Sequence, residues 1–111
     1  MAQYLYRLSL TRPGLLTEGP TAAEQATLGR HLAYLEDLKS RGSLILAGRT
    51  LTTGPETFGI AIYEAADEAE ARAFMNADPA VAEGVMTAEL FPYRVAVARD
   101  GSLSNARNPS R

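Results

Sequence analysis

Residues 21–41 carry both the start and the stop signals of one long helix. Thr21 and Glu24 form a capping box, in which the threonine oxygen accepts the amide of Glu24 and the glutamate reaches back to the cap. Gly42 follows as a residue that ends helices in the left-handed conformation. Four leucines recur at spacings of three and four residues, which is typical of one buried helix face: Leu28, Leu32, Leu35 and Leu38. We therefore expect one side of this helix to pack on a sheet.

The segment before this helix, residues 3–11, alternates with the two-residue period of a strand. One side carries Tyr4, Tyr6, Leu8 and Leu10, and the other carries Leu5, Arg7 and Ser9. One face of this strand is therefore more apolar than the other. The sequence Thr11-Arg-Pro-Gly interrupts the alternation, and we expect a loop from there to Pro20.

Three more β-prone segments follow the long helix. Residues 43–51 and 57–65 flank a turn-rich stretch that contains Gly54 and Pro55, and together they predict a hairpin. Residues 85–98 form a long apolar run that is also expected to be a strand. Pro92 interrupts this run, and proline within a strand indicates an edge or a bulge.

A second helix is predicted over residues 67–77, between the hairpin and the last strand. Asp67 and Glu70 form its capping arrangement. At Asp78-Pro79 the helical pattern restarts for a turn or two, because aspartate suits the cap and proline suits the first helical position. The second helix is therefore expected to be followed directly by a short one.

The resulting order is βαββαβ, the split βαβ arrangement of an α+β, ferredoxin-like domain with an antiparallel sheet. We assign residues 1–98 to this domain and residues 99–111 to a polar C-terminal tail. Such a sheet carries its helices on one face, and this chain has no third long helix for the other face. A second copy packed sheet against sheet is the simplest cover, so we expect a homodimer.

Composition excludes several classes of function. The 111-residue chain has no cysteine, which rules out a disulfide framework, thiol catalysis and cysteine-based metal sites. It has a single histidine, so a histidine-rich metal site within one subunit is also excluded. The net charge of -2 predicts no general attraction to nucleic acid. No apolar run approaches the roughly 18 residues of a membrane span, and the N-terminus lacks the apolar core of a signal peptide, so we expect a cytoplasmic protein without a membrane partner.

Three stretches of the chain resemble the YCII-related (YciI-like) family. They are His31-Leu-Ala-Tyr-Leu, Arg41-Gly-Ser-Leu-Ile-Leu-Ala-Gly48 and Ala77-Asp-Pro-Ala-Val-Ala-Glu-Gly-Val85. The resemblance implies a dimeric α/β barrel, in which two ferredoxin-like sheets pack together. It also implies a candidate site at His31 and Asp78. A few members of that family act as small-molecule lyases or dehalogenases on aromatic-ring metabolites, while most have no established reaction.

Two positions depart from the family pattern. Arg49 stands where proline usually follows the Ala-Gly pair, and this adds a charge near the implied pocket. Ala80 stands where an aromatic residue usually follows Asp-Pro, and this is expected to enlarge or open the pocket. The substrate therefore cannot be carried over from the family.

His31 and Asp78 each have a catalytic and a structural interpretation. His31 belongs on the sheet-facing side of its helix, where an imidazole can exchange a proton with a bound substrate or can simply be a hydrogen-bonded core residue. Asp78 caps the short helix and can also orient His31, because one carboxylate accepts several hydrogen bonds. We predict that an imidazole nitrogen lies within hydrogen-bond reach of Asp78, directly or through one water.

Three further residues are candidates for substrate binding. Arg7 and Arg49 can bind a substrate carboxylate through the planar guanidinium group. For Arg7 the alternative is a solvated or interface ion pair. Tyr6 can line an aromatic pocket, although tyrosines at strand spacing usually belong to the core.

Four hypotheses for function follow. The first is a cofactor-independent lyase, isomerase or dehalogenase that acts on a small cyclic or aromatic metabolite, with His31 as acid or base and Asp78 as its orienting partner. The second is a binding or accessory dimer without turnover, and the third is a purely structural dimer. A haem role for His31 is a fourth, which a Soret shift on adding haem would test.

Overall fold

The computed structural model describes residues 1–101, so residues 102–111 of the predicted tail lie outside the described residues. In chain order the elements are β1 (Ala2–Leu10), α1 (Gly14–Thr17), α2 (Ala22–Ser40), β2 (Leu44–Arg49), β3 (Gly59–Ala65), α3 (Glu68–Ala77), α4 (Pro79–Ala82) and β4 (Met86–Tyr93). The predicted order of four strands, two main helices and a short helix before the last strand is confirmed.

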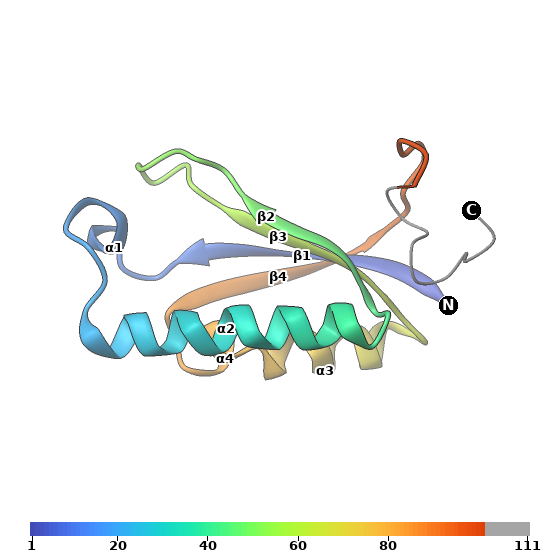
Figure 1. Cartoon of the computed structure of the whole chain (residues 1–111), viewed down its shortest axis with the longest axis horizontal. Helices are drawn as coiled ribbons and strands as arrows, with labels where there is room; N and C mark the ends of the chain where they lie inside the picture. Colours follow the sequence, from blue (N-terminus) through green and yellow to red (C-terminus); the bar gives the residue numbers. More distant parts are fainter. Residues whose placement is uncertain (102–111) are drawn as a thin grey trace.

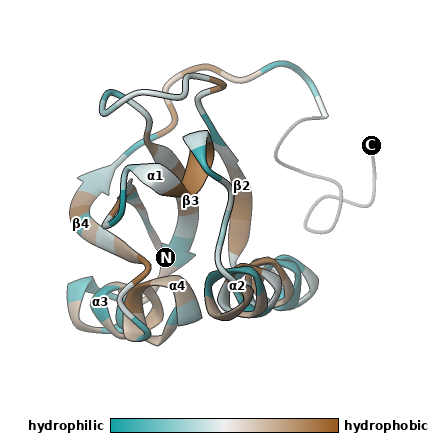
Figure 2. Cartoon of the chain, turned by 90° about the vertical axis from the view of Figure 1, so that its left-hand side faces the viewer, coloured by the Kyte–Doolittle hydropathy of each residue, from teal (hydrophilic) through white to brown (hydrophobic). Residues whose placement is uncertain are grey.

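The four strands form one antiparallel sheet in the order β2-β3-β1-β4. β1 is central, with Tyr6 opposite Ala61 on β3 and Leu90 on β4. Figure 1 shows α2, α3 and α4 along the same side of the strands, and the end-on view in Figure 2 shows them as one layer beneath the sheet. This arrangement is ferredoxin-like, as the sequence predicts. β4 is an edge strand, which explains how it accommodates Pro92.

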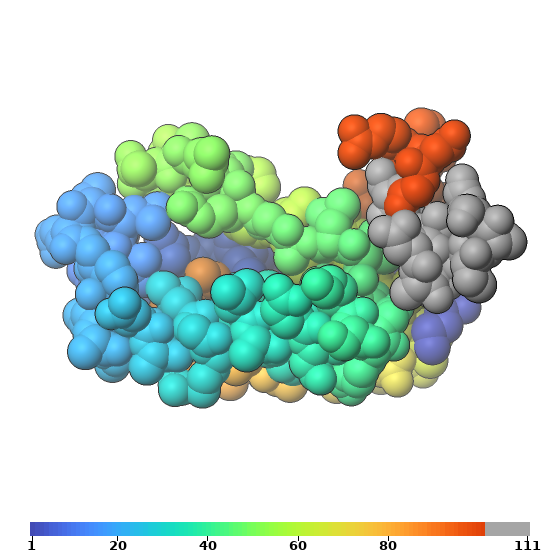
Figure 3. Space-filling model, in the orientation of Figure 1, coloured from blue at the N-terminus to red at the C-terminus, as the bar shows by residue number. Residues whose placement is uncertain are grey.

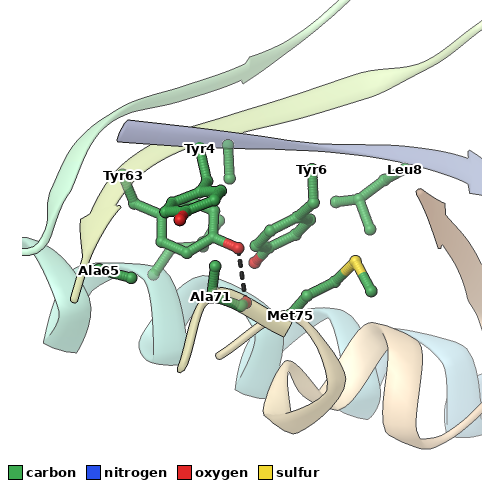
Figure 4. Packing of buried hydrophobic residues seen from close by; sticks show 9 residues of the cluster. Tyr4, Tyr6, Leu8, Tyr63, Ala65, Ala71 and Met75 are labelled. Atoms are coloured by element: carbon green, nitrogen blue, oxygen red, sulfur yellow. Dashed lines mark hydrogen bonds between the residues drawn. The ribbon is translucent and has the colours of Figure 1, made fainter. Parts of the chain in front are cut away.

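The core lies between the sheet and its helices and is rich in tyrosine. Tyr6, Tyr63 and Leu38 are fully buried. The rings of Tyr6 and Tyr63 meet edge to face with their centroids 5.4 Å apart. The Tyr63 hydroxyl donates to the Ala71 carbonyl at 2.6 Å, so the buried phenol keeps a hydrogen-bond partner (Figure 4).

The opposite side of the sheet, which we call the open face, has no helix over it in residues 1–101. The strand register places an apolar row across all four strands of this face: Leu46, Ile62, Leu5 and Phe91. Leu46 and Phe91 are exposed large hydrophobic side chains. An apolar row of this kind is typical of a surface that another molecule covers.

Two predicted elements need correction. Residues 14–17, predicted as loop, form α1, because this segment buries Leu15. The last strand ends at Tyr93 rather than at residue 98. The neighbouring β1 begins at Ala2, so the chain beyond Tyr93 has no strand to pair with, and Val95 N–H is bound instead by the Gln3 side chain at 2.7 Å.

The leucine face of α2 is only partly directed at the sheet. Leu35 and Leu38 are buried, whereas Leu32 is 60% exposed. Leu32 lies on the wall of a cavity between α2 and the sheet instead of in the core. The helix therefore touches the sheet over part of its length and stands away from it where the cavity lies.

Candidate functional site

Asp78 lies at the junction of α3 and α4, where it is the N-cap of the short helix. Its Oδ1 accepts the backbone N–H of Ala80 at 2.9 Å, and Pro79 follows at the first helical position. The side chain is fully buried, with 0% of it exposed. A buried carboxylate is costly unless its oxygens are hydrogen-bonded, so the further partners of Asp78 decide whether this placement is stable.

His31 on α2 is one of these partners. Its Nδ1 lies 2.7 Å from Oδ1 and 2.9 Å from Oδ2 of Asp78. The prediction that an imidazole nitrogen lies within hydrogen-bond reach of Asp78, directly or through one water, is confirmed, and the contact is direct. The His31 side chain is 15% exposed, so the ring reaches solvent while its inner nitrogen is held in the core.

Tyr6 on β1 is the other partner, and its hydroxyl donates to Oδ2 of Asp78 at 2.7 Å. Burial, reinforced by the negative charge of Asp78, holds the pKa of Tyr6 well above its usual range. Tyr6 therefore stays protonated and acts as a donor. Sequence inspection did not reveal this contact, because Tyr6 has the spacing of an ordinary core residue.

The network determines which nitrogen of His31 carries the proton. Asp78 accepts from the Tyr6 hydroxyl and from the Ala80 N–H, and its remaining close neighbour is Nδ1 of His31. A carboxylate in this position requires a third donor, so in the neutral ring Nδ1 is protonated and Nε2 carries the lone pair. Within the described chain Nε2 has no hydrogen-bond partner, which leaves it free to accept a proton.

A cavity of about 760 Å³ lies on the helix side of the sheet, and His31 is part of its wall. In Figure 3 it appears as a hollow between α2 and the hairpin of β2 and β3. The apolar part of its lining is Leu8, Leu10, Leu15, Leu16, Leu28, Leu32, Leu35, Leu44, Ile45, Leu46, Phe58, Ile60 and Met86. Its volume and apolar lining are typical of a small-molecule site.

Small residues on the paired strands help to form the cavity. Ala47 and Gly59 lie on the wall at positions where larger side chains would fill the space beneath α2. A β-carbon added at Gly59 would lie 3.3 Å from the Gly48 carbonyl oxygen, which is a tight contact, and 3.7 Å and 3.9 Å from the β-carbons of Arg49 and Leu8. Arg49 and Leu8 therefore flank Gly59, where no side chain stands between them.

The remaining candidate residues are placed differently. Arg49 lies on the cavity wall together with His31. Arg7 points to the open face, where its guanidinium carbon lies 4.6 Å from the centre of the Phe58 ring. Tyr6 is fully buried and is not part of the cavity wall. Direct substrate binding by Arg7 and Tyr6 stays a prediction, and this arrangement does not favour it.

The α1 segment closes one end of the cavity with Leu15 and Leu16. Its position is fixed by Arg12, which donates to Glu24 on α2 at 2.7 and 2.9 Å and to the Gly19 carbonyl at 2.9 Å. The hydrogen bond from Arg12 lowers the pKa of Glu24 to about 2. Sequence inspection missed this wall, although a Leu-Leu pair inside an otherwise polar segment was a signal for it.

The described part of the chain contains neither a metal-binding cluster nor a membrane-spanning helix. No cluster of three or more His, Asp or Glu side chains is arranged to bind a metal there. None of the helices in residues 1–101 has both the length and the apolar character needed to cross a bilayer.

The fold and the position of the site define a ferredoxin-like domain of the dimeric α/β barrel superfamily, with a histidine–aspartate pair beside an open cavity. The model of the YCII-related domain matches residues 6–93, so the chain belongs to this family. The predicted resemblance is confirmed. Among curated proteins, no sequence matches the chain significantly.

Two of the solved structures that are similar to this chain illustrate the match. One is 5-chloro-2-hydroxyhydroquinone dehydrochlorinase (TftG) from Burkholderia phenoliruptrix AC1100, in complex with 2,5-dihydroxybenzoquinone. It is 26% identical with a TM-score of 0.60, over 82% of this chain and 93% of TftG. The other is a point mutant of SnoaB, a cofactor-independent oxygenase from Streptomyces nogalater, at 11% identity and a TM-score of 0.47 over 89% of this chain and 96% of SnoaB. The likeness to SnoaB says nothing about the site.

Proposed function

We propose that this protein is a cofactor-independent enzyme that moves a proton on a small cyclic or aromatic metabolite, with His31 as the base. The observation that carries the proposal is the fixed orientation of His31. Its Nδ1 is bound to the buried Asp78, and the ring forms part of the wall of an apolar cavity. A base held by a carboxylate partner at the edge of a ligand-sized cavity is the arrangement that general base catalysis requires.

The proposed step is redox-neutral. Nε2 of His31 accepts a proton from an activated C–H or O–H of the substrate, and the bonding pair left behind forms a new double bond. In an elimination the leaving group departs with the electrons of its own bond, so that the elements of an acid HX are lost. In an isomerisation the imidazolium returns the proton to another atom. Asp78 stabilises the imidazolium and keeps the ring in place, and Tyr6 is a positioning residue that acts through Asp78.

The likeness to TftG supports elimination as the first reaction to test. TftG is named as a dehydrochlorinase of a hydroxylated ring, and its structure holds a dihydroxybenzoquinone. Loss of hydrogen chloride from such a ring belongs to the reaction class described above. We therefore propose hydroxylated or halogenated ring compounds as the substrate class.

The second candidate is a binding or accessory module that uses the same cavity without turnover. The cavity and the exposed edge of His31 support binding as well as they support catalysis. The two candidates differ in whether the base changes a bound compound. A turnover assay with a variant of His31 separates them.

The proposal includes a homodimer formed through the open face. The apolar row on that face, with Leu46 and Phe91 exposed, supports it. Exposed apolar side chains that lie in one row on a small domain indicate a surface that another molecule covers. The cytoplasmic location expected from the sequence stays a prediction.

The test uses chloride release from 5-chloro-2-hydroxyhydroquinone, followed by a panel of related ring compounds in D₂O. Exchange of a ring-adjacent hydrogen for deuterium, seen by proton NMR, detects proton removal even where no group leaves. We expect His31→Asn and Asp78→Asn each to lower the rate at least about a hundredfold, which is typical for loss of a general base. Unchanged rates in His31→Asn would refute catalysis by this residue. Binding of 2,5-dihydroxybenzoquinone without any turnover would favour the binding module.

A further inference from the structure

The charged side chains on the cavity wall do not balance one another. Besides His31, they are Glu36, Lys39 and Arg49. Lys39 is neutralised by Glu36, with its Nζ 2.9 Å from Oε1. Arg49 forms no ion pair with any residue that the structure describes. The cavity therefore carries one uncompensated cation.

Most of the donors of Arg49 are unused. Its Nη1 donates to the Thr50 carbonyl at 3.0 Å, and this is its only hydrogen bond within residues 1–101. A guanidinium has five N–H groups, and they match the geometry of a carboxylate or sulfonate. The side chain therefore keeps free donors that an oxyanion can accept.

The strand register directs Arg49 to the cavity side of the sheet. Arg49 pairs with Gly59, which pairs in turn with Leu8, a residue of the cavity wall. Because directly paired residues share a face, the side chain of Arg49 leaves β2 on the side of α2. Gly59 places no side chain beside the base of Arg49.

We propose that the cavity selects amphiphilic anions, with a carboxylate- or sulfonate-type group bound by Arg49 and an apolar ring or chain held against the leucines. This inference rests on the proposed use of the cavity as the ligand site, but it does not require His31 to catalyse anything. The apolar lining accounts for the body of the ligand, and the uncompensated guanidinium accounts for its charge. The alternative for Arg49 is a solvated charge that protects the edge strand β2.

Two fluorescent probes test the proposal. Both 8-anilinonaphthalene-1-sulfonate and N-phenyl-1-naphthylamine carry the same aromatic body, and only the first carries a sulfonate. We expect Arg49→Gln to weaken binding of the sulfonate probe about tenfold, as for loss of a charge-assisted hydrogen bond. It should change binding of the neutral probe less than about twofold. Arg49→Lys should restore part of the loss. The matched control is Lys39→Gln, whose charge is already paired and whose removal should weaken the sulfonate probe much less.

Two more variants locate the probes. Ala47→Leu fills the cavity and should weaken both probes, whereas Phe91→Ser alters the open face and should leave both unchanged. The proposal is overturned if Arg49→Gln affects the two probes equally or not at all, or if Phe91→Ser removes binding and Ala47→Leu does not. A failed turnover assay of the unaltered protein, with both titrations intact, counts against the proposed catalysis and not against this inference.

Discussion

Replacing Asp78 by alanine should reduce the free energy of unfolding by more than a lost helix cap. Removing an N-cap aspartate costs about 1 kcal/mol. The same substitution leaves the Tyr6 hydroxyl buried without its acceptor, which adds about 1–3 kcal/mol for an unsatisfied buried polar group. His31 adds less, because its partly exposed ring can bind water instead. We therefore expect Asp78→Ala to destabilise the protein by about 2–4 kcal/mol.

A double-mutant cycle isolates the contribution of the Tyr6 hydroxyl. Tyr6→Phe alone removes one hydrogen bond to a carboxylate that keeps two other neighbours, so we expect a loss of about 1–2 kcal/mol. In the double variant no hydroxyl is left unsatisfied, and the losses should fall short of their sum by about 1–2 kcal/mol. Tyr63→Phe is the matched control. The Tyr63 hydroxyl is equally buried but donates to the Ala71 carbonyl, so its loss should add to that of Asp78→Ala within about 0.5 kcal/mol.

Urea unfolding followed by far-ultraviolet circular dichroism gives these free energies, with all variants at one protein concentration because assembly affects apparent stability. Equal m-values across the variants would show that the same surface is exposed in each. Additive losses for Tyr6→Phe and Asp78→Ala would refute the hydrogen bond between them. A coupling of the same size between Tyr63→Phe and Asp78→Ala would show that the effect is not specific to Tyr6.

Three other outcomes are expected. The pKa of Glu24 falls from 4.5 to about 2 on folding, so its ion pair with Arg12 contributes stability above pH 4.5 that is lost as the pH falls toward 2. In acid titrations followed by circular dichroism, Arg12→Gln should therefore lose less stability between pH 4.5 and 2 than the unaltered protein does. An equal loss of stability in both proteins would contradict this. Phe91→Lys places a charge in the apolar row of the open face and should give a monomer by light scattering, whereas a dimer that persists would argue against this interface. Leu38→Ala should lower the free energy of unfolding by about 2–5 kcal/mol in urea, because it removes a fully buried side chain from the face of α2 that contacts the sheet. A decrease below about 1 kcal/mol would contradict that packing.

The fold was predictable because its local signals agree with one another. The capping box at Thr21 is present with both of its hydrogen bonds, and Gly42 ends the helix with a φ of 81°. The end of β4 was not predictable, because residues 95–98 are apolar although the neighbouring β1 does not extend beside them. Whether an apolar segment pairs depends on its neighbour in the sheet and not on its own composition.

The two central residues of the site were predictable from the sequence, whereas their surroundings were not. His31 and Asp78 could be chosen because each is a polar residue at a position that otherwise faces the core or caps a helix. Tyr6 was predicted to line a pocket and not to bind Asp78, because the alternation of a strand does not show which group a tyrosine hydroxyl contacts. The cavity depends on the small size of Ala47 and Gly59, and the positions of small residues in a sequence do not predict a cavity.

The open face and most of the cavity lie on opposite sides of the same sheet, with Leu46 on the edge strand β2 contributing to both, so the alternation of the strands serves two purposes. In β1, Tyr6 supports Asp78 on one side while Leu5 joins the apolar row on the other. A shift of one residue in the pairing of β1 would exchange these sides, placing Tyr6 on the open face and removing the donor that Asp78 needs. The buried carboxylate therefore also penalises the wrong register, because Asp78 would then be left with fewer donors in the core. Asp78 therefore contributes to the choice of strand register as well as holding the ring of His31 in place.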